Sequence, residues 1–153
     1  DIMNADRTKR KPSDPGGAMD IGVGQKAQRS MTVTQDTVRG YAELTGDYNL
    51  LHFDIEFTSK TRFERLMAQG GITTGLLHAL TAMEMPGPGT VFTSQNWSFP
   101  KPVYIGDTIH AEATVKSVYR RLPMADLSFS VVNQDEEEVL TGEASVYQAT
   151  PST

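Results

Sequence analysis

The spacing of apolar residues changes along the chain, from a helical period in its first half to an alternation in its second half. Near residue 40, the side chains of one face fall at the i, i+3, i+4 and i+7 positions of an amphipathic helix, at Val38, Tyr41, Ala42 and Thr45. We expect this helix to begin after Thr34, whose hydroxyl can cap the first amides, and to end at Gly46, a residue type favoured just past a helix end. A second short helix is predicted over residues 56–66, with Phe63 and Leu66 facing inward.

A longer helix is predicted over residues 69–85, where the sequence is apolar on nearly every side. A helix of this kind is normally buried in a protein core. It begins at Gly70 and Gly71, whose lack of side chains would let a ligand approach the unpaired amides of the helix N-terminus. The prolines and glycines at 86–89 end it. His78 is interpreted as a histidine with satisfied hydrogen bonds on this buried helix, in preference to a catalytic one.

Alternating apolar and polar residues predict strands in the remainder of the chain. The predicted strands cover residues 25–33, 90–99, 108–117, 125–131 and 139–148. We expect the last four to form an antiparallel meander, with turns at 121–123 and 135–138, and we expect Trp97 and Phe99 to lie in the core. A sheet wrapped around one apolar helix buries both elements. The sequence therefore predicts an α+β protein with the shape of the hot-dog fold.

Length and charge limit the organisation of the chain. Its 153 residues suffice for one core, so we expect a single domain over residues 25–150, preceded by an N-terminal tail or arm over residues 1–24. The net charge of -5 does not favour nucleic acid as a partner, and a chain without cysteine has no disulfide, thiolate nucleophile or cysteine-based metal site. No apolar run is long enough for a membrane helix or a signal peptide, so we expect a cytoplasmic protein with no membrane partner.

The loop predicted after the first helix concentrates groups that can hold and move protons. Within residues 45–54 lie a carboxylate at Asp47, a carboxamide at Asn49 and an imidazole at His52. Loops carried on a rigid scaffold often bear catalytic groups, although solvated turns with Asp and Asn are commoner. The loop is therefore a candidate active site whose interpretation depends on the rest of the chain.

Several ordered motifs resemble those of one enzyme family. The segments YAELTGDYNLLHFD (41–54), MAQGGITTGL (67–76), MPGPG (85–89), FPKPVYIGDTI (99–109) and TGEASV (141–146) are similar to those of the MaoC-like acyl dehydratases, or (R)-specific enoyl-CoA hydratases. The resemblance covers nearly everything after residue 25. It implies the hot-dog fold and a hydro-lyase acting on acyl thioesters of fatty acid metabolism.

The resemblance also implies roles for individual residues. The Asp and His of the family's GDxNPxH motif, its catalytic dyad, fall on Asp47 and His52 with their spacing kept. The surroundings of the dyad depart from the family pattern. Leu50 replaces the usual proline, Gln69 stands where the family usually has the His of AHG, and His78 stands where R-hydratases often have a serine. The resemblance therefore predicts the reaction of this chain better than it predicts the substrate.

The implied reaction is the syn addition of water to a trans-2-enoyl thioester, or the reverse dehydration. Asp47 and His52 would hold the water and move its protons, while the amides of Gly70 and Gly71 would stabilise the oxygen of the thioester carbonyl. Asn49 is expected either to hold the turn or to contact substrate, and Gln69 either to orient the loop or contact substrate, or to have no specific role.

The resemblance gives expectations for cofactors and partners as well. No metal or cofactor is expected, because CoA or the pantetheine of an acyl carrier arrives as part of the substrate. One hot-dog unit is too thin to enclose such a substrate, so a homodimer or a dimer of dimers is implied, with the sheets joined edge to edge. Two alternatives stay open: an acyl-CoA thioesterase, and a non-catalytic acyl-thioester-binding subunit of a heteromer.

Overall fold

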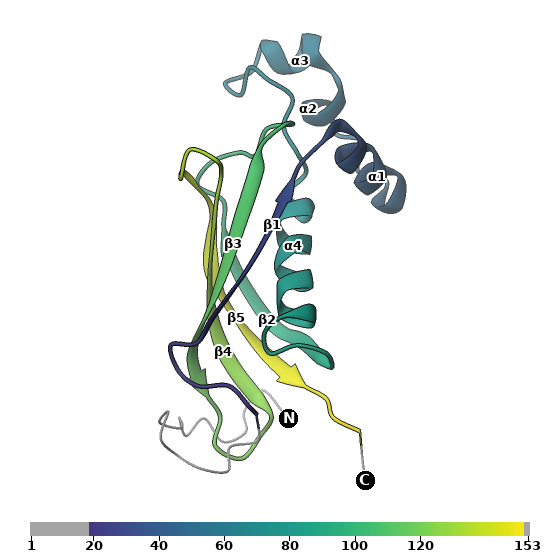
Figure 1. The fold of residues 1–153 in the computed structure, drawn as a ribbon. Helices are drawn as coiled ribbons and strands as arrows, with labels where there is room; N and C mark the ends of the chain where they lie inside the picture. The colour runs from purple at the N-terminus through teal and green to yellow at the C-terminus, as the bar shows by residue number, and fades with distance from the viewer. Residues whose placement is uncertain (1–18, 152–153) are drawn as a thin grey trace.

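A five-stranded antiparallel sheet packs one of its faces against a long helix, and three shorter helices gather near one end of that helix (Figure 1). The computed structural model describes residues 19–151. The strands are β1 (Lys26–Thr32), β2 (Thr90–Ser98), β3 (Thr108–Val118), β4 (Met124–Val132) and β5 (Glu138–Gln148). The helices are α1 (Gln35–Thr45), α2 (Leu50–Phe53), α3 (Ile55–Ser59) and α4 (Gly70–Met83). All five predicted strands and the long predicted helix are present, which confirms the α+β class.

The hydrophobic core lies between the sheet and α4. Alternate residues of β3 are buried from Ile109 to Val115, and the side of α4 that carries Leu76, Leu77 and Leu80 is buried as well. The opposite face of the sheet is polar. On that face, Gln28 and Lys26 of β1 both donate hydrogen bonds to Glu112 of β3, which lowers the pKa of that carboxyl. The alternation in the sequence therefore marks the two faces of the sheet correctly.

The predicted four-strand meander is only partly correct. The strand order is β1-β3-β4-β5-β2, so only β3, β4 and β5 follow one another as a meander. β2 pairs with β5 instead of β3, so the connection from β2 to β3 crosses the sheet, while β1 pairs with β3. As a consequence, β1 and β2 form the two edges of the sheet.

α4 is buried on one side only, which corrects the expectation that it is buried all round. Its other side is exposed at Gly75, His78 and Met83, and Met83 keeps 64% of its surface. His78 is therefore not a buried histidine. Its ring contacts that of Phe92 on β2, with 4.5 Å between the ring centroids.

Two aromatic residues of the β2 region lie in different surroundings. Trp97 is partly buried and contacts Phe129 edge to face, as a core residue would. Phe99 is 53% exposed, so its predicted core position is wrong. Phe99 follows the last residue of β2 and lies beside Gly70, at the beginning of α4.

The first predicted helix is confirmed, and the second is wrong. Thr34 caps α1 in a reciprocal pair with Thr37, and Gly46 ends α1 in the left-handed conformation with φ 84°. In place of one helix over residues 56–66, the chain forms α2 and α3, with Asp54 between them. Asp54 ends α2, and its side chain accepts the amide of Phe57, which starts α3 one residue later. The pattern of apolar residues does not show that one aspartate ends a helix and starts the next.

The core includes residues that were assigned to the tail. Met19 and Ile21 keep only 3% and 6% of their surface and belong to the core cluster. The core therefore extends several residues before the predicted domain boundary at residue 25. The rest of the predicted tail, residues 1–18, lies outside the described residues. Within 19–151, no helix has the length and apolar character needed to cross a membrane.

Candidate active site

The end of α1 places Asp47. The left-handed Gly46 donates its amide to the carbonyl of Ala42, which closes the helix and turns the chain away from its axis. The hydroxyl of Thr45 then bridges the helix end and the loop, because it donates to the carbonyl of Tyr41 at 2.7 Å and accepts the amide of Asp47 at 3.3 Å. Asp47 is thus held by the helix end through its backbone, while its side chain stays 43% exposed.

Asn49 starts the next helix. Its side-chain oxygen accepts the amide of Leu51 at 3.1 Å, which caps α2, and its own amide donates to Oδ1 of Asp47 at 3.3 Å. The structure therefore shows Asn49 in the turn-holding role. Contact of Asn49 with substrate stays a prediction. The consequence of this cap is that His52 lies on a short helix, and not on a loop as the sequence suggested.

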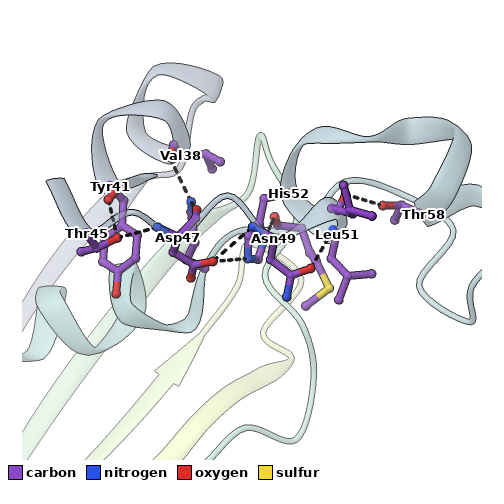
Figure 2. A network of polar contacts seen from close by, with 11 residues as sticks. Val38, Tyr41, Thr45, Asp47, Asn49, Leu51, His52 and Thr58 are labelled. Carbon is purple, nitrogen blue, oxygen red and sulfur yellow. Dashed lines mark hydrogen bonds and ion pairs between the residues drawn. The ribbon is translucent and has the colours of Figure 1, made fainter. Parts of the chain in front are cut away.

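His52 is buried and has a defined tautomer. Its Nδ1 lies 2.7 Å from the carbonyl oxygen of Met67. Because a carbonyl can only accept, Nδ1 carries the proton in the neutral ring, and Nε2 carries the free lone pair. Nε2 faces Oδ1 of Asp47 at 3.9 Å (Figure 2). The structure therefore brings together the two predicted members of the dyad.

The spacing between His52 and Asp47 suits one shared water molecule. At 3.9 Å the two atoms are too far apart for a direct hydrogen bond. With His52 neutral and Asp47 ionised, both atoms are acceptors, and a water can donate one proton to each of them. Such a water would be polarised by both groups at once.

The first turn of α4 approaches this pair from the other side. Met67 donates its amide to the carbonyl of Leu51, and Ala68 donates its own to the carbonyl of Val103, so the chain entering α4 is held on both sides. The first amides of a helix have no partner within the helix, and no side chain of residues 19–151 caps this end of α4. The amides of Gly70 and Gly71, together with the positive end of the helix dipole, can therefore face a developing negative charge.

The two glycines make room for aromatic side chains. A Cβ on Gly71 would overlap the hydroxyl of Tyr41, whose side chain lies over this turn, and a Cβ on Gly70 would lie 3.4 Å from the ring of Phe99. The expectation that both glycines simply open the helix to a ligand is therefore incomplete. Sequence reasoning did not assign Tyr41 or Phe99 to the site, although Tyr41 begins the motif that carries Asp47.

Neither Asp47 nor His52 lines any of four hollows on the surface of the described residues. A hollow of about 160 Å³ opens beside Gly70 and Phe99, between Arg62 and Lys101. Larger hollows of about 460 and 220 Å³ lie on the polar face of the sheet, away from α4, and one of about 430 Å³ lies along α3, beside Asp54 and Phe57. We assign the site to the head of α4, because that is where proton-transfer groups and free amides converge, and size alone does not identify a site.

Gln69 is the remaining predicted site residue, and it is almost fully buried, with 1% of its surface exposed. Its Nε2 donates to the carbonyls of Val38 and Asp47 at 3.0 and 3.4 Å. In Figure 2 the dashed line from Val38 marks the first of these bonds. The predicted site residues thus converge at the N-terminal end of α4, while His78 lies about two turns further along that helix.

Comparisons with known proteins agree with this arrangement. A family model described as MaoC like domain matches residues 18–129. The chain is 35% identical over 129 residues to an (R)-specific enoyl-CoA hydratase of Aeromonas caviae, and the aligned residues cover 84% of this chain and 96% of that protein. It is also 35% identical over 127 residues to a 3-hydroxybutyryl-CoA dehydratase of Methylorubrum extorquens, and here the aligned residues cover 83% of this chain and 80% of that protein.

A solved structure supports the same conclusion. The (R)-hydratase from A. caviae, described as involved in PHA biosynthesis, matches with a TM-score of 0.81 at 34% identity, covering 86% of this chain and all of that chain. The likeness therefore extends to the whole sheet-and-helix arrangement and confirms the hot-dog fold. By sequence and by structure, the chain belongs to the family of proteins with a MaoC-like domain.

Proposed function

We propose that the chain is a hydro-lyase that catalyses the reversible syn hydration of trans-2-enoyl-CoA to (R)-3-hydroxyacyl-CoA. The observation that carries the proposal is the 3.9 Å gap between Nε2 of His52 and Oδ1 of Asp47, at the head of a helix with free amides. The gap suits one water molecule, and the helix end suits the carbonyl of a thioester. Names of relatives add the substrate class, since two of them act on CoA thioesters as hydratase and dehydratase.

Asp47 and His52 act on the water as a pair. One member removes a proton as the water oxygen attacks C3 of the enoyl group, and the pair then delivers a proton to C2 from the same side. Both new bonds form on the side that faces the dyad, which makes the addition syn. Positioned acid and base groups contribute about 10²- to 10⁴-fold. Because the two groups share one water, we assign the proton transfers to the dyad as a unit.

The amides of Gly70 and Gly71 stabilise the charge that develops during the reaction. Attack at C3 pushes electrons onto the thioester oxygen, which becomes enolate-like. Backbone amides at a helix N-terminus are fixed in place and need no reorganisation to bind that oxygen, and one such donor contributes about 10²- to 10³-fold. The scheme uses no metal ion and no resident cofactor. CoA enters as part of the substrate, and the cytoplasm is the compartment we propose.

We also propose that the working form is a homodimer or a dimer of dimers. Among the described residues, nothing covers the side of α4 that carries Gly75 and Met83, and β2 forms an edge of the sheet beside it. A second copy that met this surface would cover the apolar face of α4. The site would then lie near the subunit boundary, where residues of both copies can surround a long acyl thioester.

The activity is tested with crotonyl-CoA. Wild-type protein is expected to abolish the absorbance of the conjugated enoyl thioester without releasing free thiol, and chiral analysis of the product is expected to give the (R)-alcohol. Release of thiol would replace the proposal with a thioesterase. No reaction with short, long or branched enoyl-CoAs would replace it with a binding subunit.

The dyad is tested by Asp47→Asn and His52→Gln. Each variant is expected to lower kcat by at least about 100-fold, because each removes one of the two groups that hold the water. Thermal unfolding of both variants is the control for folding and should change by only a few degrees. Wild-type turnover in either variant would contradict the assignment of that residue.

A further inference from the structure

The carboxamide of Gln69 lies between two elements that are far apart in the sequence. Gln69 is the last residue before α4, and 1% of its surface is exposed. Its Nε2 reaches the carbonyl of Val38 in the first turn of α1 at 3.0 Å and the backbone carbonyl of Asp47 in the loop after α1 at 3.4 Å. One side chain therefore connects the head of α4, α1 and the backbone of a dyad residue.

The orientation of this carboxamide follows from its neighbours. Both carbonyls can only accept, and the NH₂ group has two protons, so it can serve both of them. The reverse orientation would place three oxygens together. In the orientation observed, Oε1 is buried and has no hydrogen-bond partner within residues 19–151. A buried acceptor without a partner is unfavourable. What this orientation provides in return is the pair of hydrogen bonds that Nε2 donates to the carbonyls of Val38 and Asp47.

Asp47 has few other contacts that fix it relative to α4. Its amide reaches the hydroxyl of Thr45 at the end of α1, and its Oδ1 accepts the amide of Asn49, both at 3.3 Å and both from residues next to it in the sequence. His52, in contrast, is tied to the carbonyl of Met67, two residues before Gln69. The segment 67–71 thus holds His52 through a backbone oxygen, holds Asp47 through the side chain of Gln69, and supplies the amides at Gly70 and Gly71.

We infer that Gln69 is a positioning residue for Asp47. By holding the backbone carbonyl of Asp47 at the head of α4, Gln69 sets the distance between the Asp47 carboxylate and the His52 imidazole. The inference rests on the proposed hydratase activity. It assigns no substrate contact to Gln69, because its donors are already used and its surface is buried. Gln69 acts through Asp47 and does not touch the reacting atoms.

The first test is Gln69→Met, which keeps the length of the side chain and removes both donors. A misplacement of about 1 Å in a catalytic group can lower turnover by about 100-fold. We therefore expect kcat for crotonyl-CoA to fall about 10- to 100-fold while KM changes by less than about threefold. Gln69→Glu, which has the same shape but brings carboxyl oxygens to the two carbonyls, should lower kcat at least as much. An unchanged kcat in Gln69→Met would overturn the inference.

A matched control separates this role from general packing. Thr81→Val changes a residue within α4 that, like Gln69, has 1% of its surface exposed, and whose hydroxyl has no partner among the described residues. It should leave kcat unchanged. A similar fall in kcat for Thr81→Val and Gln69→Met would mean that any buried polar change on α4 disturbs the site, and this result would also overturn the inference.

A double-mutant cycle with Asp47→Asn gives the decisive test. If Gln69 acts through the carboxylate of Asp47, Gln69→Met should have less than about a twofold effect on the residual kcat of Asp47→Asn, because effects of residues that act as a unit are not additive. An equal fall in both backgrounds would indicate a purely structural role and overturn the inference. Failure of the proposed function is a different result, because wild-type protein would then not hydrate crotonyl-CoA at all.

Discussion

At the scale of single residues, the two glycines that begin α4 serve different neighbours. Gly71 has no room for a Cβ, because the hydroxyl of Tyr41 fills that space, whereas Gly70 has the ring of Phe99 at ordinary contact distance. Tyr41 comes from α1 and Phe99 from the end of β2, so the head of α4 is fitted between two aromatic side chains. The amides of these glycines are exposed to a ligand only along the directions that the aromatic side chains leave open.

The position of Gly71 gives a prediction about one methyl group. Gly71→Ala is expected to displace Tyr41, to lower the free energy of unfolding by about 1–3 kcal/mol as overpacking does, and to lower kcat for crotonyl-CoA. Urea unfolding and the hydration assay measure the two effects. Gly40→Ala on α1 is the control, since nothing lies within 4 Å of its Cβ, and it should be neutral or stabilise by up to about 1 kcal/mol. Equal stability of the two variants would contradict the close approach of Tyr41.

The sequence could predict the reactive groups of the site but not what holds them. Asp47, Asn49 and His52 are marked by their chemistry within one short loop, and the structure brings them together. The carbonyl of Met67 that fixes the His52 tautomer is a backbone atom, which no residue type can mark. The bonds of Gln69 to α1 and the loop depend on how distant segments fold together, so they were also invisible in the sequence.

At the scale of elements, α1 carries the loop at its C-terminal end and depends on a cap at its N-terminal end. The hydroxyl of Thr34 accepts the amide of Thr37, and that of Thr37 accepts the amide of Thr34, each at 3.1 Å. Val38, which receives the bond from Gln69, lies in the turn that this pair closes. The cap therefore helps to place Asp47, because it fixes the turn of α1 to which Gln69 is bonded, and Gln69 also holds the backbone of Asp47.

Thr34→Ala is expected to destabilise the protein by about 1 kcal/mol, because it leaves the amide of Thr37 without its partner. The free energy of unfolding in urea measures this loss. Thr34→Ser keeps the hydroxyl and should lie within about 0.5 kcal/mol of the wild type. If serine and alanine destabilised equally, the lost methyl group would explain the effect and the cap would not.

Periodicity predicted the elements better than it predicted their neighbours. Alternation depends only on which face of a strand is buried, so all five strands were found in the sequence. It carries no information about pairing, and β2 was therefore placed beside β3 although it pairs with β5. The helix predicted over residues 56–66 failed for another reason, since Asp54 and Lys60 bound a helix of only five residues.

At the scale of the whole molecule, one helix covers one face of the sheet, and within residues 19–151 no layer covers the outer side of that helix (Figure 1). Met83 on α4 is 64% exposed. An exposed apolar side chain on an uncovered helix side favours an interface. This surface also adjoins the free edge of β2, where strands of two copies could meet.

The proposed dimer gives a prediction about mass. Light scattering after size exclusion should give at least twice the 16.8 kDa of one chain, and Met83→Glu should shift the protein toward the monomer and lower its activity. Val23→Glu changes an exposed apolar residue that is not on α4 or β2 and serves as the control. A monomeric wild type, or equal behaviour of the two variants, would contradict an interface on this face.

The hydrogen bond between His52 and the carbonyl of Met67 has a consequence for protein engineering. A contact that another side chain makes to orient a catalytic histidine is lost when that side chain is replaced. A backbone oxygen is present whichever amino acid occupies the position. The side chain at residue 67 can therefore be varied by directed evolution, for instance to reshape the surroundings of the dyad, without deleting the acceptor that sets the protonation pattern of the imidazole.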